Sequence, residues 1–195
     1  MIRATRLVIS DLRAKAEWCY ESRGWKSILK VLLTDGTPAM ILYRLMQWSR
    51  RWRLVPLELF FNRTNTICCS CIIGRGAEFG PGFVLIHSLG VVINGNVRGG
   101  SGVKIEHQVT IGAEKRQTPV IGDDVFFGAG CKVIGGVIIG KGVRIGANAV
   151  VVKDIPAYAT VVGIPPAQII KLKEPLRSEL DENPEDPLAT QQVSV

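Results

Sequence analysis

From Ile73 onward, apolar side chains recur every six residues along the chain. An aliphatic or aromatic residue opens each unit of six, Gly often follows it, and the fifth position is usually small or apolar. The opening residues are Ile73, Phe79, Leu85, Val91, Ile105, Ile111, Ile121, Phe127, Val133, Ile139, Ile145 and Val151. A helix would space its apolar residues by three and four, and a hairpin sheet by two, so a period of six fits neither. It predicts short strands that turn a corner after each unit, with three units completing one triangular coil of a parallel β-helix.

The period of six is interrupted twice, and each interruption predicts a local departure from the regular coil. The register slips by two residues around 97–102, and we expect one turn to bulge there. Between Gly112 and Ile121 stands the polar segment 113–120, which is too hydrophilic to continue a buried wall. We expect this segment to project as a loop, and projecting loops on rigid scaffolds commonly carry function.

The first 70 residues follow a different pattern. Apolar spacing typical of helices runs over Ser10–Tyr20, Trp25–Leu33 and Pro38–Trp52, with Ser10 and Thr37 in capping positions. Residues 174–195 are acidic, contain three prolines and show no apolar period. The pattern therefore predicts an N-terminal helical segment (1–70), a β-helix (71–173) and a disordered acidic tail (174–195).

Charge and hydropathy narrow the picture only slightly. Residues 1–70 carry a net charge of +7 and residues 174–195 carry −5. A solvated basic helix face explains the first value more simply than a membrane or nucleic-acid surface, so we expect no nucleic-acid partner. The short apolar runs of the N-terminal part are broken by Asp35 and Arg44, and no apolar secretory segment opens the chain. We therefore expect a cytoplasmic protein.

Five cysteines are present, and two of them form Cys68-x-x-Cys71. A structural zinc site needs four ligands, and no second pair follows at a useful distance. We expect these thiols to be buried and unmetallated.

The chain has two histidines, His87 and His107, each two residues beyond the opening residue of its unit. Their separation equals one coil plus the two-residue bulge, so we expect the imidazoles to stack on one face, about 4.8 Å apart. A single histidine on such a face is more often structural, but a pair beside a long loop favours function. Neutral imidazole serves as a general base near neutral pH without a metal. Zinc shared between subunits is the rival use of these side chains, but we expect no metal because each chain offers only two of the required donors.

These residues also resemble a known family. Leu85-Ile-His-Ser-Leu-Gly-Val-Val92 and Val103-Lys-Ile-Glu-His-Gln-Val-Thr-Ile-Gly112 are similar to the catalytic segments of hexapeptide-repeat acyltransferases. The similarity is greatest to the serine acetyltransferases and their relatives in polysaccharide gene clusters. It extends over residues 36–170 and implies a left-handed parallel β-helix, acetyl-CoA as co-substrate, His87 as catalytic base and a homotrimer or dimer of trimers. It also implies that the pantetheine arm contacts the backbone near Gly112, Ala129 and Ala147.

The departures from that family concern the acceptor. Ile86 stands where the family has an aspartate before the histidine, and Ile72 stands where its partner carboxylate falls. In the loop, Gln117 and Thr118 replace the arginine and histidine that hold serine, although Arg116 is adjacent. Without the aspartate, we expect His107, Glu106 or a backbone carbonyl to orient His87, and Arg116 and Gln117 to contact the acceptor.

The sequence therefore predicts an acetyl-CoA-dependent O-acetyltransferase that uses His87, with His107 beside it. Its acceptor is either L-serine or a sugar hydroxyl, and the sequence leaves both open. The alternative is a catalytically silent hexapeptide protein that scaffolds an enzyme complex or lies at a membrane surface, which the two missing carboxylates favour.

Overall fold

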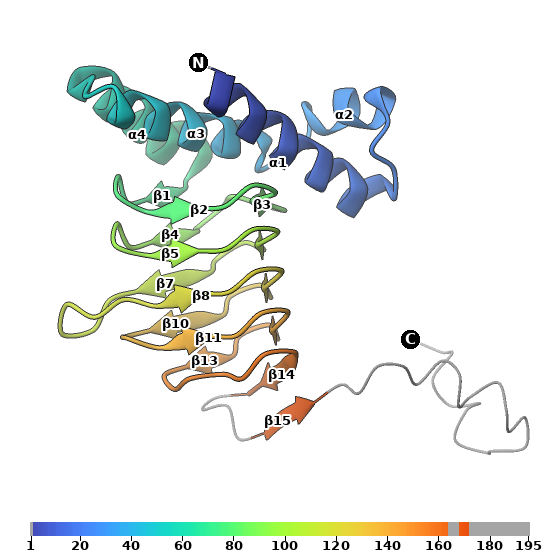
Figure 1. Cartoon of the computed structure of the whole chain (residues 1–195), viewed down its shortest axis with the longest axis vertical. Coiled ribbons are helices and arrows are strands. Elements are labelled where there is room, and N and C mark those ends of the chain that lie inside the picture. Colours follow the sequence, from blue (N-terminus) through green and yellow to red (C-terminus); the bar gives the residue numbers. More distant parts are fainter. Residues whose placement is uncertain (1, 164–167, 172–195) are drawn as a thin grey trace, which may run out of the picture.

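The computed structural model describes residues 2–163 and 168–171 of the 195-residue chain. Four helices come first and lie at one end of a stack of short strands (Figure 1). The helices are α1 (Ile2–Tyr20), α2 (Trp25–Val31), α3 (Thr37–Arg51) and α4 (Val55–Cys69). The predicted tail, residues 174–195, lies outside the described residues.

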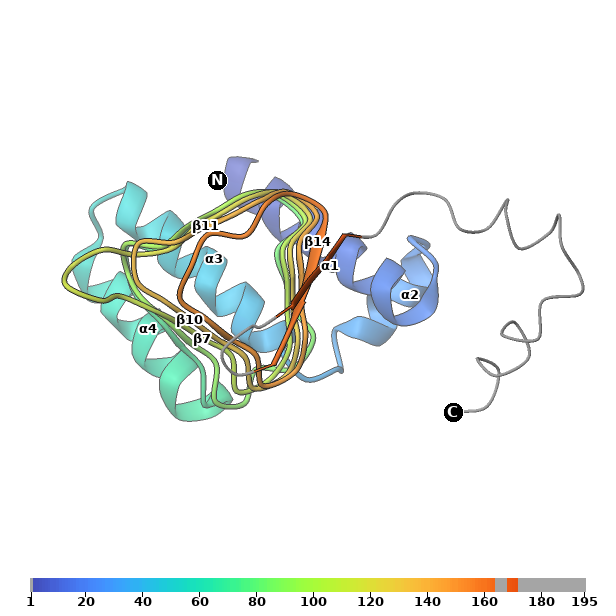
Figure 2. The ribbon, with the colours of Figure 1, turned by 90° about the horizontal axis from the view of Figure 1, so that it is seen from below.

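Three sheets form the walls of a triangular prism, seen most clearly along the stack (Figure 2). Wall A holds β1 (Ile72–Ile73), β4 (Val92–Ile93), β7 (Thr110–Gly112), β10 (Lys132–Ile134) and β13 (Val150–Val151). Wall B holds β2 (Glu78–Phe79), β5 (Arg98–Gly99), β8 (Val120–Ile121) and β11 (Ile138–Ile139). Wall C holds β3 (Val84–Leu85), β6 (Lys104–Ile105), β9 (Phe126–Phe127), β12 (Arg144–Ile145), β14 (Ala159–Val162) and the antiparallel β15 (Gln168–Lys171). Successive strands visit the walls in turn and pair in parallel, which confirms the predicted mainly β, left-handed parallel β-helix with N-terminal helices.

Inward-pointing residues repeat in columns and build the core of the prism. On wall A, the paired residues Ile73, Ile93, Ile111, Val133 and Val151 are all buried. The residue two places before each also points inward, because side chains alternate along a strand. This pair of buried positions in every unit explains why a period of six dominates the sequence.

The two-residue slip lies earlier than the sequence indicated. Ile93, Gly99 and Ile105 are spaced by six and occupy walls A, B and C, so the stretch 97–102 is regular. The longer step is from Leu85 to Ile93, at the turn that contains His87. The true register was hidden because Gly99 occupies a core position. A Cβ there would lie 2.2 Å from the ring of Phe79, which fills the space instead.

The polar segment 113–120 projects from the prism between β7 and β8, as predicted (Figure 1). Its backbone closes on itself, since the N–H of Glu114 donates to the Gln117 carbonyl at 3.0 Å and the reverse bond is 2.8 Å. Lys115 and Arg116 turn with φ of 47° and 68°. The loop is therefore a short hairpin anchored at the corner between walls A and B.

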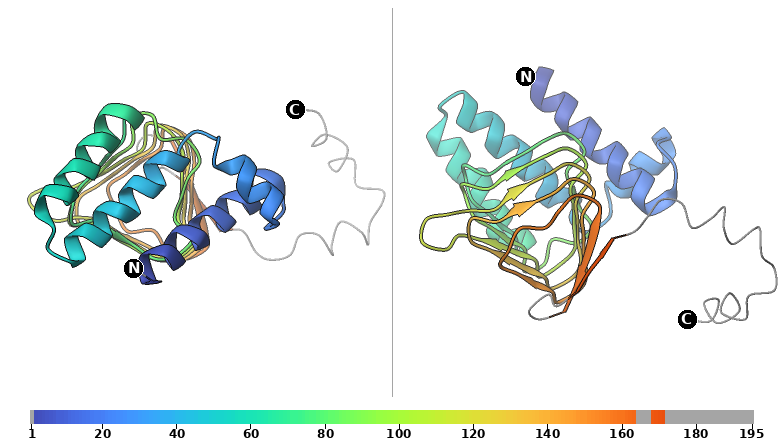
Figure 3. Two further views of the ribbon diagram at one scale, coloured as in Figure 1. Left: turned by 90° about the horizontal axis from the view of Figure 1, so that it is seen from above. Right: turned by 60° about the horizontal axis from the view of Figure 1, so that its bottom comes forward.

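Helices α3 and α4 lie across the open end of the first coil (Figure 3, left). The buried Tyr43 ring packs against Phe79 and Phe83, with ring centroids 6.3 and 5.2 Å away, and its hydroxyl donates to the Ala77 carbonyl at 3.1 Å. Beside it, the buried Arg44 guanidinium pairs with Asp11 of α1 at 2.6 Å. The helices thus seal the hydrophobic end of the solenoid and form one core with it.

The start of one predicted helix was wrong, and one helix was missed. α1 begins at Ile2 and carries Ser10 in its interior, because apolar spacing continues upstream and Leu12 and Ala16 pack with Val31 of α2. α4 was not predicted at all. Its apolar residues surround the helix, leaving Phe60 and Ile67 60% and 77% exposed, so they do not form the single stripe that signals a helix.

The thiols also differ from expectation. Cys71 is buried but Cys68 is exposed, so the Cys-x-x-Cys pair does not point into one core. Within the described residues, no three His, Cys, Asp or Glu side chains gather where they could hold a metal ion. Among residues 2–163 and 168–171, no helix has both the length and the apolar character needed to cross a membrane.

Candidate functional site

His87 lies in the turn that leads from β3 on wall C to β4 on wall A. This is the step with two additional residues, and it closes through Gly90, whose φ is 70°. The N–H of Gly90 donates to the Ser70 carbonyl at 2.9 Å, which ties the turn to the end of α4. The imidazole is 52% exposed, so a ligand can reach it from solvent.

A carboxylate orients His87, and it comes from the helical segment. Nδ1 of His87 lies 3.1 Å from Oδ2 of Asp35, in the turn between α2 and α3. With a carboxylate as partner, Nδ1 carries the hydrogen and Nε2 keeps the lone pair that a general base needs. The orienting groups expected from the sequence were His107, Glu106 or a backbone carbonyl, and that expectation was wrong.

Asp35 is itself held in its ionised form. Partial burial alone would raise the pKa of this carboxyl. The N–H of Gly36 at 2.7 Å, together with hydrogen bonds from His87 and the Ser88 hydroxyl, outweighs burial and lowers the pKa below the ordinary value. The carboxylate therefore stays charged at neutral pH and can stabilise an imidazolium at His87.

His107 lies directly below His87 on the next coil, as the spacing predicted. The ring centroids are 6.0 Å apart and the planes are inclined by 76°, so the rings meet edge to face and do not stack. Nδ1 of His107 lies 3.7 Å from the Glu106 carboxylate. The two histidines thus have different acidic neighbours.

Ala129 and Ala147 continue the same column. Leu85, Ile105, Phe127 and Ile145 pair in register, and each residue two places further on lies at the corner between walls C and A. Main-chain hydrogen bonds join this corner from coil to coil, as between the Asn148 N–H and the Ala129 carbonyl at 2.8 Å. Small side chains below the histidines leave backbone accessible to an extended ligand. Gly112 is separate from this column, at the far end of wall A, next to Ile134.

Arg116 and Gln117 are not near His87 of the same chain. Their loop leaves the corner between walls A and B, and Thr118 donates to the Asn96 carbonyl at 3.3 Å on that corner. His87 occupies the corner between walls C and A. The sequence placed the loop beside the histidines, and within one chain that placement was wrong because successive corners of a triangular coil face different directions.

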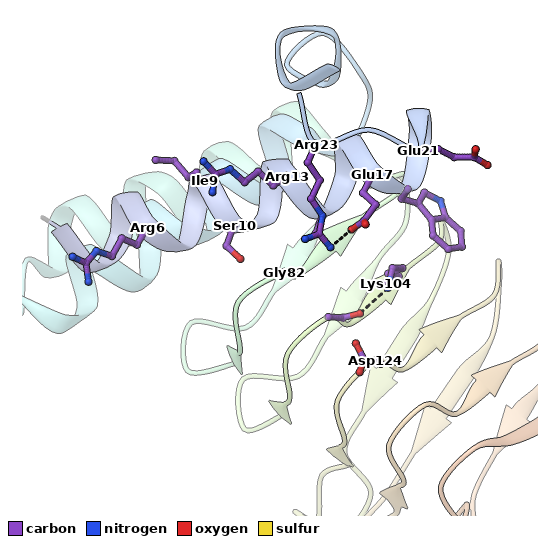
Figure 4. A pocket seen from close by; sticks show the side chains of 13 residues that line it. Arg6, Ile9, Ser10, Arg13, Glu17, Glu21, Arg23, Gly82, Lys104 and Asp124 are labelled. Carbon is purple, nitrogen blue, oxygen red and sulfur yellow. Dashed lines mark hydrogen bonds and ion pairs between the residues drawn. The ribbon is translucent and has the colours of Figure 1, made fainter. Parts of the chain in front are cut away.

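A groove with a volume of about 1180 Å³ also lies apart from His87. It separates one face of α1 from the corner between walls B and C, with Arg6, Arg13 and Glu17 on one side and Lys104 and Asp124 on the other (Figure 4). Arg23 and Glu17 pair at 2.5 Å on the α1 side of the groove (Figure 4). The groove does not include the His87 and Asp35 pair.

The proteins similar to this chain are named as hexapeptide transferases and serine acetyltransferases. A family model described as bacterial transferase hexapeptide (six repeats) matches residues 118–153. A serine acetyltransferase of Helicobacter pylori strain J99 is 35% identical over 145 residues, which are 72% of this chain and 85% of that protein. The serine acetyltransferase of Synechococcus elongatus is 36% identical over 142 residues, 70% of this chain. That match spans only 58% of the Synechococcus protein.

Solved structures extend the similarity to the helices. The crystal structure of Neisseria gonorrhoeae serine acetyltransferase has a TM-score of 0.81 and 28% identity, covering 94% of this chain and 71% of that one. A serine acetyltransferase in complex with CoA has a TM-score of 0.73 and 26% identity, covering 83% of this chain and 68% of that one.

Proposed function

Because this chain belongs to the serine acetyltransferase family, we propose that it transfers the acetyl group of acetyl-CoA to the hydroxyl of L-serine. The observation that carries the proposal is the His87 and Asp35 pair, an accessible imidazole whose Nδ1 faces a charged carboxylate at 3.1 Å. Such a pair is what a hydroxyl acceptor needs, because an alcohol must lose its proton as it attacks.

In the proposed mechanism, Nε2 of His87 takes the proton of the acceptor hydroxyl while the oxygen attacks the thioester carbonyl. The Asp35 carboxylate stabilises the imidazolium that forms. Collapse of the tetrahedral intermediate breaks the carbon–sulfur bond, and His87 returns the proton to the departing CoA thiolate. Backbone N–H groups of the turn are proposed to hold the oxyanion, which contributes several kcal/mol in comparable sites.

We propose that acetyl-CoA lies along the column formed by His107, Ala129 and Ala147, with Gly112 contributing from a neighbouring subunit. Since Arg116 and Gln117 stand on a different corner from His87, their proposed contact with the acceptor also requires a neighbour. These positions support a homotrimer or a dimer of trimers. The proposed acyltransferase domain is 71–173, with residues 1–70 as a helical cap, and the proposed location is the cytoplasm.

One observation favours a second acceptor. Ile86 and Ile72 occupy the places of two family carboxylates, and Asp35 is already bonded to His87, so an ammonium group finds fewer anionic partners here. A neutral sugar hydroxyl does not need them. The second candidate function is therefore O-acetylation of a saccharide by the same chemistry.

The experiment is an acceptor panel with the purified full-length chain. Loss of thioester absorbance from acetyl-CoA is followed with L-serine, with nucleotide sugars and with oligosaccharides at millimolar concentration. Turnover with L-serine is the expected result. Turnover with saccharides alone would replace serine by the second candidate, and no turnover with any acceptor would favour the non-catalytic scaffold.

A further inference from the structure

One buried cation lies behind the His87 and Asp35 pair. Lys15, in the middle of α1, is 0% exposed. Its ammonium donates to the backbone carbonyls of Asp35, Leu85 at 2.9 Å and Ile86 at 3.4 Å. Three protons thus meet three carbonyls from two segments that are far apart in sequence.

Burying the Lys15 ammonium costs free energy. Burial is the main reason that the pKa of Lys15 falls from 10.5 to about 8, which means that the protein interior disfavours the charge. An apolar side chain of the same length would avoid that penalty, but it would leave the three carbonyls without this donor. Lys15 therefore does more than fill space, because it ties the carbonyls of two separate segments to one ammonium group.

This one ammonium binds the backbone of Asp35 and that of the two residues before His87. The backbone carbonyl of Asp35 accepts a hydrogen bond from Lys15, while the side-chain carboxylate of Asp35 contacts His87. The backbone carbonyl of Ile86, the residue immediately before His87, also accepts a hydrogen bond from Lys15. The two segments also touch directly, since a Cβ on Gly36 would lie 2.4 Å from the Leu85 carbonyl oxygen. Lys15 thereby joins the two segments that carry the carboxylate and the imidazole.

We propose that Lys15 is a positioning residue of the acetyl-transfer site, which sets the geometry of the Asp35 and His87 pair from α1. The inference rests on the proposed function, and it adds a residue of the helical cap that touches neither substrate nor CoA. A purely structural clamp would predict a different outcome, because its loss would weaken the cap whatever residue stands at 35.

A double-mutant cycle separates the two roles. Lys15→Met, Asp35→Asn and the double variant are compared with the wild type for kcat and for the KM of acetyl-CoA. We expect Lys15→Met to lower kcat about tenfold with KM within about twofold, and to add less than about twofold in the Asp35→Asn background. Equal losses in both backgrounds would overturn the proposal. Arg13→Met is the matched control, an exposed cation on the same helix, and it should stay within about twofold of the wild type.

A second measurement does not depend on turnover. The chain contains two histidines, so selective isotope labelling gives two imidazole signals that a His107→Gln variant assigns. The nitrogen chemical shifts of His87 should report an Nδ1–H tautomer in the wild type and a mixture of tautomers in Lys15→Met. An unchanged tautomer in Lys15→Met would contradict the proposal, and Lys15→Gln serves if the Met variant does not fold. If no acceptor is turned over by the wild type, the proposed function fails while the tautomer result still decides the role of Lys15.

Discussion

A substitution at Gly36 tests how closely the N-terminal helical segment packs against the β-helix. It adopts φ 77° and ψ −24° just before α3, between Asp35 and Thr37. A Cβ at this position would lie 2.4 Å from the Leu85 carbonyl oxygen and 3.1 Å from the Lys15 ammonium. The first distance is about 1 Å shorter than an ordinary carbon–oxygen contact. Gly36→Ala must therefore push the Asp35 turn away from the strand that precedes His87.

The magnitude follows from two contributions. A left-handed backbone costs an Ala residue about 1–2 kcal/mol. Forcing a methyl group against backbone that cannot move aside costs about 1–3 kcal/mol more. Because each kcal/mol shifts the unfolding midpoint of a protein of this size by about 2–4 °C, we expect a decrease of roughly 4–20 °C. The kcat for acetyl transfer should fall as well, since the displaced turn carries Asp35.

The assay is thermal unfolding followed by circular dichroism, together with CoA release. Gly24→Ala is the matched control, because Gly24 has φ −66° and a Cβ there would meet only the Ser22 hydroxyl at 3.4 Å. This control should remain within about 1 kcal/mol of the wild type. A Gly36→Ala protein with an unchanged midpoint and unchanged kcat would refute the tight contact between the Asp35 turn and β3.

Two further predictions concern buried charges. Asp11→Ala leaves the Arg44 guanidinium buried without its carboxylate, so denaturant unfolding should show a loss of about 3–5 kcal/mol. Arg23→Ala, at an exposed pair, should leave the denaturant midpoint close to that of the wild type. Comparable losses would contradict the buried pair. The pKa of Lys15 is lower in the folded protein, at about 8, than its ordinary value of 10.5, so the unfolded chain binds the extra proton between these values. Relative to Lys15→Met, the wild type should therefore gain up to about 3 kcal/mol of stability as pH rises from 8 toward 10.5, and a constant difference in urea unfolding across that range would be the opposing result.

The solenoid could be predicted because each unit repeats the same physical requirement. Two inward positions in every six must be apolar, so the sequence records the wall directly, as at Ile111 and Val133. The predicted register was wrong where a residue of one coil fills the volume left by a small residue of the next coil, as Phe79 does beside Gly99. The pattern of apolar positions along the sequence does not show when a large side chain in one coil compensates for a small one in the next.

The site was predictable only in part, for a related reason. His87 stands out because it lies in the repeat, at a fixed offset from Leu85. Asp35 lies 52 residues away in a turn between helices, and no period connects the two. The only local signal was an Asp-Gly pair that interrupts an apolar run, which is typical of any turn. The partner of His87 follows from how the cap docks, and docking is a property of the folded chain.

In the proposed mechanism, His87, supported by Asp35, removes the proton from an acceptor hydroxyl. The most direct measurement is the kcat of His87→Ala for acetyl transfer from acetyl-CoA to L-serine, on protein whose unfolding midpoint matches the wild type. We expect a loss of at least about 100-fold, the range typical of a general base, and a smaller loss for His107→Ala. A His87→Ala protein that retains wild-type kcat, or a larger loss at His107, would contradict the account.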